Sequence, residues 1–416
     1  AVFSPDGTRI LTASSDKTTK LWDIDGNILL DLKTFEGKVN SVVFSTDGCG
    51  FLTACDDGTA TLWTLETPLI VDLNKHTADV NKAVFSPDGS RILTASGDYT
   101  AKLWDIKGNL LKNLKHRDVV TSAVFSPDGK KILTASWDST VKLWDLEGNL
   151  LLRYRPHREL VTYAVFSPEG NRILTASVHS TVKLYDLEDK TLSELDKHTE
   201  MVNFAMFSPD GYRILTASKD GTARVCTLEG LELIELNHGG PVSSAVFSDD
   251  GHYILTASED STSKLWDSEG KLLKDLKHEK AISYAAFSPK GNRILTASED
   301  STARVWTLEG LELVKLSHNG PVSYAQFSPD GRRIVTASED GTAKLWDLEG
   351  NLLAELNKHN DIVNYAVFSP DGNRIITASR DGTAKVWYTP EAIYDWLKTA
   401  PILQLSEEEG KKLGIK

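Results

Sequence analysis

One block of sequence returns ten times along the chain, and this repetition constrains the fold more than any other feature. Each block has an apolar run ending in Phe, a turn resembling Ser-Pro-Asp-Gly, and a segment resembling Ile-Leu-Thr-Ala-Ser. A period of roughly 40–45 residues carrying several short strands is typical of a propeller blade. The phenylalanines recur every 40 or 41 residues, at Phe3, Phe44, Phe85, Phe125, Phe166, Phe207, Phe247, Phe287, Phe327 and Phe368.

The third block shows how one unit is expected to fold. Its β-branched and apolar runs predict strands at 80–85, 91–96, 101–105 and 110–114. The turn at 86–89 has Pro at its second position and Gly at its fourth, as type I turns favour. Four antiparallel strands per unit, covered on both faces by neighbouring units, predict an all-β protein of ten four-stranded blades.

At this point the sequence resembles the WD-repeat β-propeller family over residues 1–388. Trp-Asp pairs stand at Trp22, Trp104, Trp144, Trp266 and Trp346, each followed by Asp. The resemblance implies a buried His–Ser–Asp–Trp hydrogen-bond network in each complete blade. The expected sets are His76, Ser96, Asp98, Trp104; His116, Ser136, Asp138, Trp144; His238, Ser258, Asp260, Trp266; His278, Ser298, Asp300, Trp306; His318, Ser338, Asp340, Trp346; and His359, Ser379, Asp381, Trp387.

A Ser, a His and an Asp close together also suggest a catalytic triad. Here the group recurs in blade after blade, and the resemblance places it inside the sheets, which favours a structural network. The sequence has no Gly-x-Ser-x-Gly elbow, phosphate-binding loop or His-Glu-x-x-His zinc pair. We therefore predict a protein that is not an enzyme and has no metal or cofactor site.

The charge, the cysteines and the lack of long apolar stretches indicate which partners and which compartment suit the chain. A formal net charge of −13 disfavours non-specific binding to nucleic acid or to an anionic membrane. Cys49, Cys55 and Cys226 are too few and too irregularly spaced for a disulfide framework. No signal peptide and no apolar stretch long enough to span a bilayer occurs. These features predict a cytoplasmic protein that binds a protein or peptide segment.

The number of blades in the closed ring stays open between two alternatives. Even spacing favours one ring of ten blades over residues 1–388. The start of the chain within a repeat favours a seven-bladed ring from the fourth unit onward, with three blades left from an upstream ring. Because residue 1 is Ala and lies within a repeat, we expect a covalently linked upstream domain.

Surface positions that depart from the repeat are candidates for partner binding. In the family, partners contact one rim of the ring at three positions in each blade. Carried over to this chain, they predict an apolar partner-binding patch made of Val119, Trp137, Leu160, Val178 and Met201. An exposed Trp in such a patch is typical of a binding hot spot. Beside it the same positions predict an acidic arc of Glu259, Glu299 and Glu339, and the middle positions are all Asn, Ser or Thr, such as Asn81 and Thr121.

Residues 389–416 break the repeat and predict a short helical tail. Thr389 suits an N-cap, and Pro390 the first helical position. The tail resembles the ends of large bacterial WD-repeat proteins that carry an upstream signalling module. The leading hypothesis is a non-catalytic scaffold that binds partners at one rim, as part of a larger signalling or sensor protein. The alternatives are an enzyme with its site in the central channel and a purely structural spacer.

Overall fold

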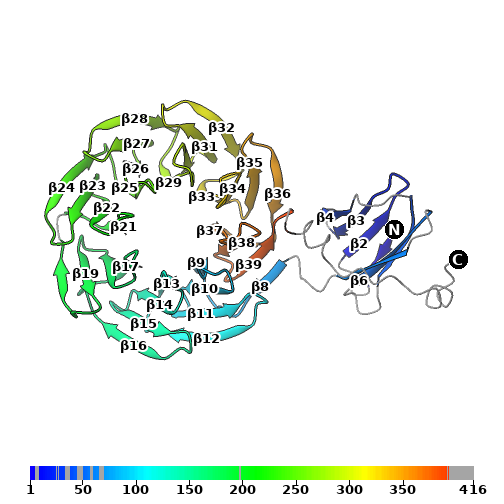
Figure 1. Cartoon of the computed structure of the whole chain (residues 1–416), viewed down its shortest axis with the longest axis horizontal. Helices are drawn as coiled ribbons and strands as arrows, with labels where there is room; N and C mark the ends of the chain where they lie inside the picture. Colours follow the sequence, from blue (N-terminus) through cyan, green and yellow to red (C-terminus); the bar gives the residue numbers. More distant parts are fainter. Residues whose placement is uncertain are drawn as a thin grey trace. The chain divides into compact units, whose positions relative to one another are not determined.

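The structure, a computed structural model, describes residues 1–4, 9–24, 26, 28–32, 38–44, 50–56, 60–64, 70–195, 198–390 and 392. These residues form antiparallel sheets, which confirms the all-β fold. The chain divides into two compact units, residues 71–387 and residues 1–70 with 388–416, and each is described by itself. Figure 1 shows the strands of both units.

The larger unit holds eight four-stranded sheets. The first four sheets are β9 (Val80–Phe85), β10 (Arg91–Ser96), β11 (Thr100–Asp105), β12 (Leu110–Lys115); β13 (Val120–Phe125), β14 (Lys131–Ser136), β15 (Val141–Asp145), β16 (Leu150–Tyr154); β17 (Val161–Phe166), β18 (Arg172–Ser177), β19 (Val182–Asp186), β20 (Leu192–Glu194); and β21 (Val202–Phe207), β22 (Arg213–Ser218), β23 (Thr222–Thr227), β24 (Glu232–Asn237).

The remaining four sheets continue the same order until the last, whose outer strand comes from elsewhere in the sequence. They are β25 (Val242–Phe247), β26 (Tyr253–Ser258), β27 (Thr262–Asp267), β28 (Leu272–Lys277); β29 (Ile282–Phe287), β30 (Arg293–Ser298), β31 (Thr302–Thr307), β32 (Glu312–Ser317); β33 (Val322–Phe327), β34 (Arg333–Ser338), β35 (Ala343–Asp347), β36 (Leu352–Leu356); and β37 (Val363–Phe368), β38 (Arg374–Ser379), β39 (Ala384–Tyr388), β8 (Ile70–Leu73).

The smaller unit contains the first two repeats. Its four-stranded sheet is β1 (Val2–Phe3), β2 (Arg9–Ala13), β3 (Thr19–Asp23) and β4 (Ile28–Leu32), and its second sheet is β5 (Val39–Phe44), β6 (Gly50–Cys55) and β7 (Ala60–Thr64). The ten predicted blades are therefore present as ten sheets. The second has three strands in the part that the structure describes, because β8, which follows it in sequence, joins the last sheet instead.

The eight sheets of the larger unit surround a central channel as an eight-bladed propeller (Figure 1). Both predicted ring sizes, ten blades and seven blades plus three, are therefore wrong. The ring is closed by β8, which precedes the first complete blade and pairs with β39 of the last one. A strand from the start of the ring thus completes the sheet at its end, so the last blade has four strands like the other seven.

The contacts at the closure repeat those inside the ring. The Asn81 side chain donates to the Val120 carbonyl of the next blade at 3.1 Å, and at the closure Asn364 donates in the same way to Val80 at 3.3 Å. The Arg374 guanidinium likewise binds the Gly89 carbonyl across the closure at 3.2 Å. The last and first blades therefore meet as any two successive blades do.

Hydrophobic side chains between successive blades form the core. Val305 and Leu316 of one blade pack with Val322 and Trp346 of the next, all of them buried. The cluster at the closure has the same composition and includes Leu73 of β8. Each blade thus buries both faces against its neighbours, which explains why strands such as β10 are apolar on both sides.

Of the predicted tail, the structure describes only Thr389, Pro390 and Ala392. The Thr389 hydroxyl accepts a hydrogen bond from the Ala392 N–H at 3.3 Å, as an N-cap side chain does. The rest of residues 389–416 lies outside the described residues, and there the helical tail stays a prediction.

Candidate functional site

A buried hydrogen-bond network crosses six blades of the ring, and the blade β33–β36 shows its geometry. The Trp346 indole N–H donates to the Thr336 hydroxyl at 2.9 Å. That hydroxyl lies 2.7 Å from His318 Nε2, and His318 Nδ1 lies 3.0 Å from Asp340 Oδ2. We assign the proton to Nδ1, because the indole occupies a lone pair of the hydroxyl, which then donates to Nε2.

The predicted serine is not the link between the histidine and the tryptophan. Thr336, two residues earlier on the same strand, occupies that place. The Ser338 hydroxyl instead donates to the backbone carbonyl of Pro321 at 2.9 Å and accepts from the Asp340 N–H at 3.1 Å. Ser338 therefore fixes the turn that carries the aspartate, and the network is correctly described as Asp–His–Thr–Trp.

All six predicted blades contain this arrangement. Each Trp N–H lies 2.9 Å from its threonine, and each His Nε2 lies 2.7 Å from the same threonine; these hubs are Thr94, Thr134, Thr256, Thr296, Thr336 and Thr377. The signal for the hub was the invariant Thr of the Ile-Leu-Thr-Ala-Ser segment. Sequence alone does not separate two hydroxyls at positions i and i+2, which lie on the same side of a strand.

The electrostatics of the network favour a fixed structural role. Burial lowers the pKa of His318 to about 4 even though Asp340 acts in the opposite direction, so the imidazole is neutral at pH 7. Burial raises the pKa of Asp340, but hydrogen bonds from Thr342 and the Asn319 N–H outweigh it and bring the value to about 2. The indole and the hydroxyl are both buried, so the triad-like residue types do not form an accessible nucleophile.

Two blades depart from this pattern in ways that the sequence indicated. In the blade β17–β20, His157 Nδ1 binds the Thr181 hydroxyl, because His179 stands where an Asp is usual. Its Tyr185 replaces Trp and stacks on Tyr154 with ring centroids 4.6 Å apart. In the next blade, buried Cys226 occupies the Trp position while His198 keeps its aspartate and threonine partners.

The apolar rim patch consists of Val119, Trp137, Leu160, Val178 and Met201. The backbone N–H of Trp137 donates to the backbone carbonyl of Val119 at 2.9 Å, and that of Val178 donates to the carbonyl of Leu160 at 3.1 Å. The backbones of these positions are therefore paired within their blades. Met201 begins the next blade, so the patch extends over three consecutive blades. Trp137 is 41% exposed, and the other four side chains are half-buried.

The acidic arc occupies the next three blades of the same rim. Glu259, Glu299 and Glu339 are exposed, and each donates its backbone N–H to the rim residue that precedes the inner strand of its own blade, at 2.8–2.9 Å. The arrangement repeats that of Trp137 and Val119. The rim therefore carries an apolar sector followed by an acidic sector.

The middle rim positions have a structural role. The Thr121 hydroxyl donates to the Val161 carbonyl of the neighbouring blade at 3.0 Å, and Asn81 and Asn203 bind the next blade in the same way. These side chains join the inner strands to one another. Their polar groups are therefore engaged between blades.

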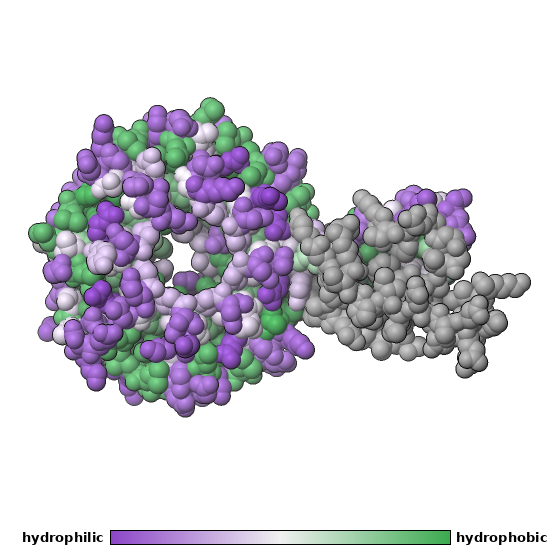
Figure 2. All heavy atoms as spheres, viewed as in Figure 1, coloured by the Kyte–Doolittle hydropathy of each residue, from purple (hydrophilic) through white to green (hydrophobic). Residues whose placement is uncertain are grey.

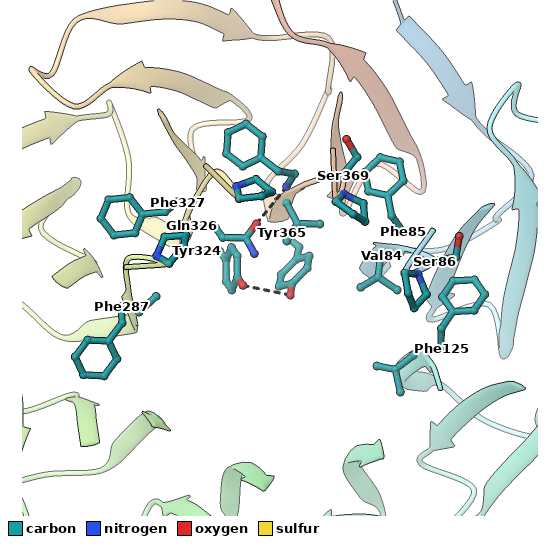
Figure 3. Close-up of a pocket in the computed structure, with 18 of the residues that line it drawn as sticks. Val84, Phe85, Ser86, Phe125, Phe287, Tyr324, Gln326, Phe327, Tyr365 and Ser369 are labelled. Carbon is teal, nitrogen blue, oxygen red and sulfur yellow. Dashed lines mark hydrogen bonds between the residues drawn. The ribbon is translucent and has the colours of Figure 1, made fainter. Parts of the chain in front are cut away.

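A cavity of about 590 Å³ lies in the central channel on the face opposite the rim patch. Its lining includes the prolines of the Ser-Pro turns and, further inside, Tyr284, Tyr324 and Tyr365. Figure 3 shows Tyr324 and Tyr365 directed into the channel, and their hydroxyls lie 3.3 Å apart. The sequence analysis did not single out these three tyrosines. Their position in the repeat nevertheless holds different residue types in different blades, whereas most positions of the repeat are nearly constant.

Among the described residues, no group of three or more His, Cys, Asp or Glu is placed to hold a metal ion. A search of the same residues for a helix that could cross a bilayer, by length and by apolar character, found none.

Comparisons with known proteins agree with this architecture. A family model described as the WD domain, G-beta repeat, matches residues 1–23, 30–64, 270–307, 311–347 and 350–388. A model described as the IFT122 first beta-propeller matches residues 82–268. The crystal structure of the computationally designed protein Ika8 is also similar, with 29% sequence identity and a TM-score of 0.69. That alignment covers 76% of this chain and 98% of Ika8.

The repeat, the blades, the buried Asp–His–Thr–Trp networks and the two matching sequence models thus agree along the chain. The chain belongs to the WD-repeat β-propeller family.

Proposed function

We propose that the eight-bladed ring is a non-catalytic scaffold that binds a protein or peptide segment on the rim around Trp137. WD-repeat propellers are generally protein-interaction scaffolds and typically non-enzymatic. The observation that carries the proposal is that Trp137 is 41% exposed at the start of the apolar sector, the blades that hold the rim patch. The backbone of Trp137 is held in place by its hydrogen bond to Val119. We further propose that the chain is part of a larger signalling or sensor protein in the cytoplasm, which remains a prediction from the sequence.

The apolar sector has the composition of a binding hot spot. An exposed Trp with half-buried aliphatic neighbours offers a large apolar contact that water leaves when a partner docks. Polar and charged side chains border this sector, among them Glu159, His179 and Lys219. A polar border around an apolar centre is the usual anatomy of a protein interface.

The acidic sector indicates the charge of the partner. A segment that anchors an apolar side chain on Trp137 and continues along the rim reaches Glu259, Glu299 and Glu339 in turn. The net charge of −13 adds to their field. We therefore propose a partner segment that combines an apolar anchor with Lys or Arg residues.

The experiment compares a Trp137→Asp, Leu160→Lys double variant with the wild-type chain. Partners captured from source-cell lysate are identified by mass spectrometry and then measured with the purified partner segment. Loss of a Trp hot spot costs about 2 kcal/mol or more, so we expect affinity to fall by about 30-fold or more.

A Tyr212→Asp variant is the matched control. Tyr212 is 73% exposed and lies in the turn after β21, on the opposite face, so the same kind of substitution leaves the rim intact. Binding that survives in the rim variant, or that is lost equally in the control, would contradict the rim site. Capture of no partner by the wild-type chain would favour a structural spacer.

A further inference from the structure

The inner strands present a ring of eight side chains to the channel, one from the third position of each strand. We name it the collar; its members are Lys82, Ser122, Tyr163, Phe204, Ser244, Tyr284, Tyr324 and Tyr365. The position that follows each collar residue is Ala in all eight strands, and the position that precedes it is Asn, Thr or Ser, whereas the collar positions range from Lys to Ser, Phe and Tyr. The channel surface, like the rim, therefore differs from blade to blade.

Aromatic rings line most of the collar. The ring centroids of Tyr284 and Tyr324 lie 4.4 Å apart, those of Tyr324 and Tyr365 4.2 Å, and those of Tyr163 and Phe204 5.2 Å. The three consecutive tyrosines all line the 590 Å³ cavity, and Figure 3 shows two of them, Tyr324 and Tyr365. They offer aromatic surface together with phenol hydroxyls.

Lys82 is the cation of the collar. Its Nζ lies 5.1 Å from the centroid of the Tyr163 ring, having reached past the small Ser122 of the intervening blade. Burial lowers the pKa of Lys82 to about 8, and no carboxylate opposes that shift. Within the described residues, no carboxylate lies within ion-pair distance of this ammonium. The channel therefore holds a positive charge without a counter-ion from the protein.

Two further donors in the collar lack partners. The side chains of Ser122 and Ser244 are 1% and 2% exposed, and among the described residues neither hydroxyl has a hydrogen-bond partner. Buried hydroxyls are normally paired, so an unpaired one needs an explanation such as a bound ligand. Ser122 stands next to Lys82 around the ring, on the adjacent inner strand.

Below the collar the channel wall is largely apolar. The next inward-facing positions towards the cavity mouth include Val84, Val124, Ala286 and Val367, with Gln326 at the equivalent position of β33, and all five line the cavity. Ala286 is smaller than the valines at most equivalent positions, which leaves room on that side. Figure 2 shows the channel as an open hollow at the centre of the ring. A ligand entering from this face passes the turn residues, among them Asp249 and Pro87, then the largely apolar wall, and reaches the cationic collar last.

We propose that the channel binds a small organic anion with a planar apolar body, such as an aromatic carboxylate. Its body lies against the apolar wall and the tyrosines, and its anionic group accepts hydrogen bonds from Lys82 and Ser122. A cavity of 590 Å³ falls within the usual range for small-molecule sites. The site is distinct from the rim patch, because its cavity is lined by the opposite ends of the inner strands and by the Ser-Pro turns, and the collar lies inside the channel.

The test uses the full chain and two probes of the same shape, indole-3-acetate and its neutral amide, with inorganic phosphate as a third. Isothermal titration calorimetry should show binding of the acetate at least tenfold tighter than that of the amide. Phosphate should bind weakly, because it lacks the planar body. Equal affinities for acetate and amide, or no binding of the acetate at about 1 mM, would overturn the proposal.

Variants locate the site. Lys82→Met should weaken indole-3-acetate binding by about 10- to 100-fold, as expected for loss of a charge-assisted hydrogen bond. Lys130→Met, at an exposed turn, is the matched control and should bind as the wild type does. Ala286→Phe should block the apolar wall while leaving Lys82 in place. Unchanged affinity in both channel variants would refute the site.

A measurement on the wild-type chain does not depend on the folding of variants. The Lys82 Nζ, followed by NMR after isotopic labelling of lysine, should titrate at a higher pH when indole-3-acetate is bound, because an adjacent anion favours the charged amine. An unchanged titration at saturating indole-3-acetate would show that the carboxylate does not reach Lys82 and would refute the proposed contact.

Discussion

Substituting Leu73 by Ala tests the closure of the ring, because Leu73 belongs to β8, which joins a sheet whose other strands lie far from it in sequence. Its side chain is fully buried in the cluster at the closure, together with Val71, Val80 and Val386. Removing a buried leucine side chain costs about 2–5 kcal/mol, from lost transfer free energy and from the cavity left behind. We expect Leu73→Ala to lower the free energy of unfolding of the ring by that amount.

The assay is equilibrium unfolding of the full chain in urea, followed by circular dichroism. Leu316→Ala is the matched control, since Leu316 is fully buried in the outer strand β32 inside the ring. The two substitutions should cost similar amounts. Because a buried leucine is costly anywhere, this comparison alone does not identify which blade contains Leu73.

A double-mutant cycle supplies that information. Leu73 and Val386 lie in one cluster although more than 300 positions separate them in the sequence, so their substitutions by Ala should be non-additive by about 0.5–3 kcal/mol. Leu73→Ala combined with Val225→Ala, in a distant blade, should be additive within about 0.5 kcal/mol. Additivity of Leu73→Ala with Val386→Ala would refute an eight-bladed ring closed by β8.

Three further predictions follow from the network, the collar and a turn. Thr336→Val keeps the shape but leaves the Trp346 indole N–H unpaired, so the free energy of unfolding should fall by about 1–3 kcal/mol in urea; a smaller loss would contradict the hub role. Lys82→Met should stabilise the ring at pH 7 by up to about 3 kcal/mol. Burial lowers the pKa of Lys82 from 10.5 to about 8, so below pH 8 folding must bury the charged ammonium at a cost. The gain should disappear by about pH 10.5, where the amine is neutral in both states, and a gain that does not depend on pH would contradict the buried charge as its cause. Ser301→Gly should raise the free energy of unfolding by about 0.5–1 kcal/mol in thermal unfolding. Ser301 has a φ of 67°, a left-handed conformation that favours glycine, and the equivalent residue of the next blade is Gly341. Destabilisation would show that the serine side chain matters more than the backbone strain.

The sequence predicted the elements of the candidate site unevenly. The rim positions of Trp137 and Val119 could be found because they stand at a fixed place in the repeat, and the structure pairs their backbones. Thr336 was missed because Ser338 offers an identical functional group on the same side of the strand. The collar was missed because Lys82 and Tyr324 become neighbours of one channel only when distant repeats close into a ring.

The sequence by itself determined the strands, the turns and the His, Asp and Trp members of the buried networks, although not their threonine hub. These depend on residues within one repeat, such as the apolar run before Phe85, the Ser86–Gly89 turn and the His76–Asp98 pair, and the same contacts recur in the other five blades whose networks were predicted. Local patterning and short-range hydrogen bonds were sufficient for them.

Only the tertiary structure decided the number of blades and the strand that closes the ring. Nearly identical repeats make nearly identical interfaces, so the sequence of one junction is compatible with rings of several sizes. Closure depends on the angle accumulated over all junctions and on which strand completes the last sheet. Here β8 leaves the repeat that precedes it and pairs with β39, and that exchange separates two repeats from the eight that form the ring.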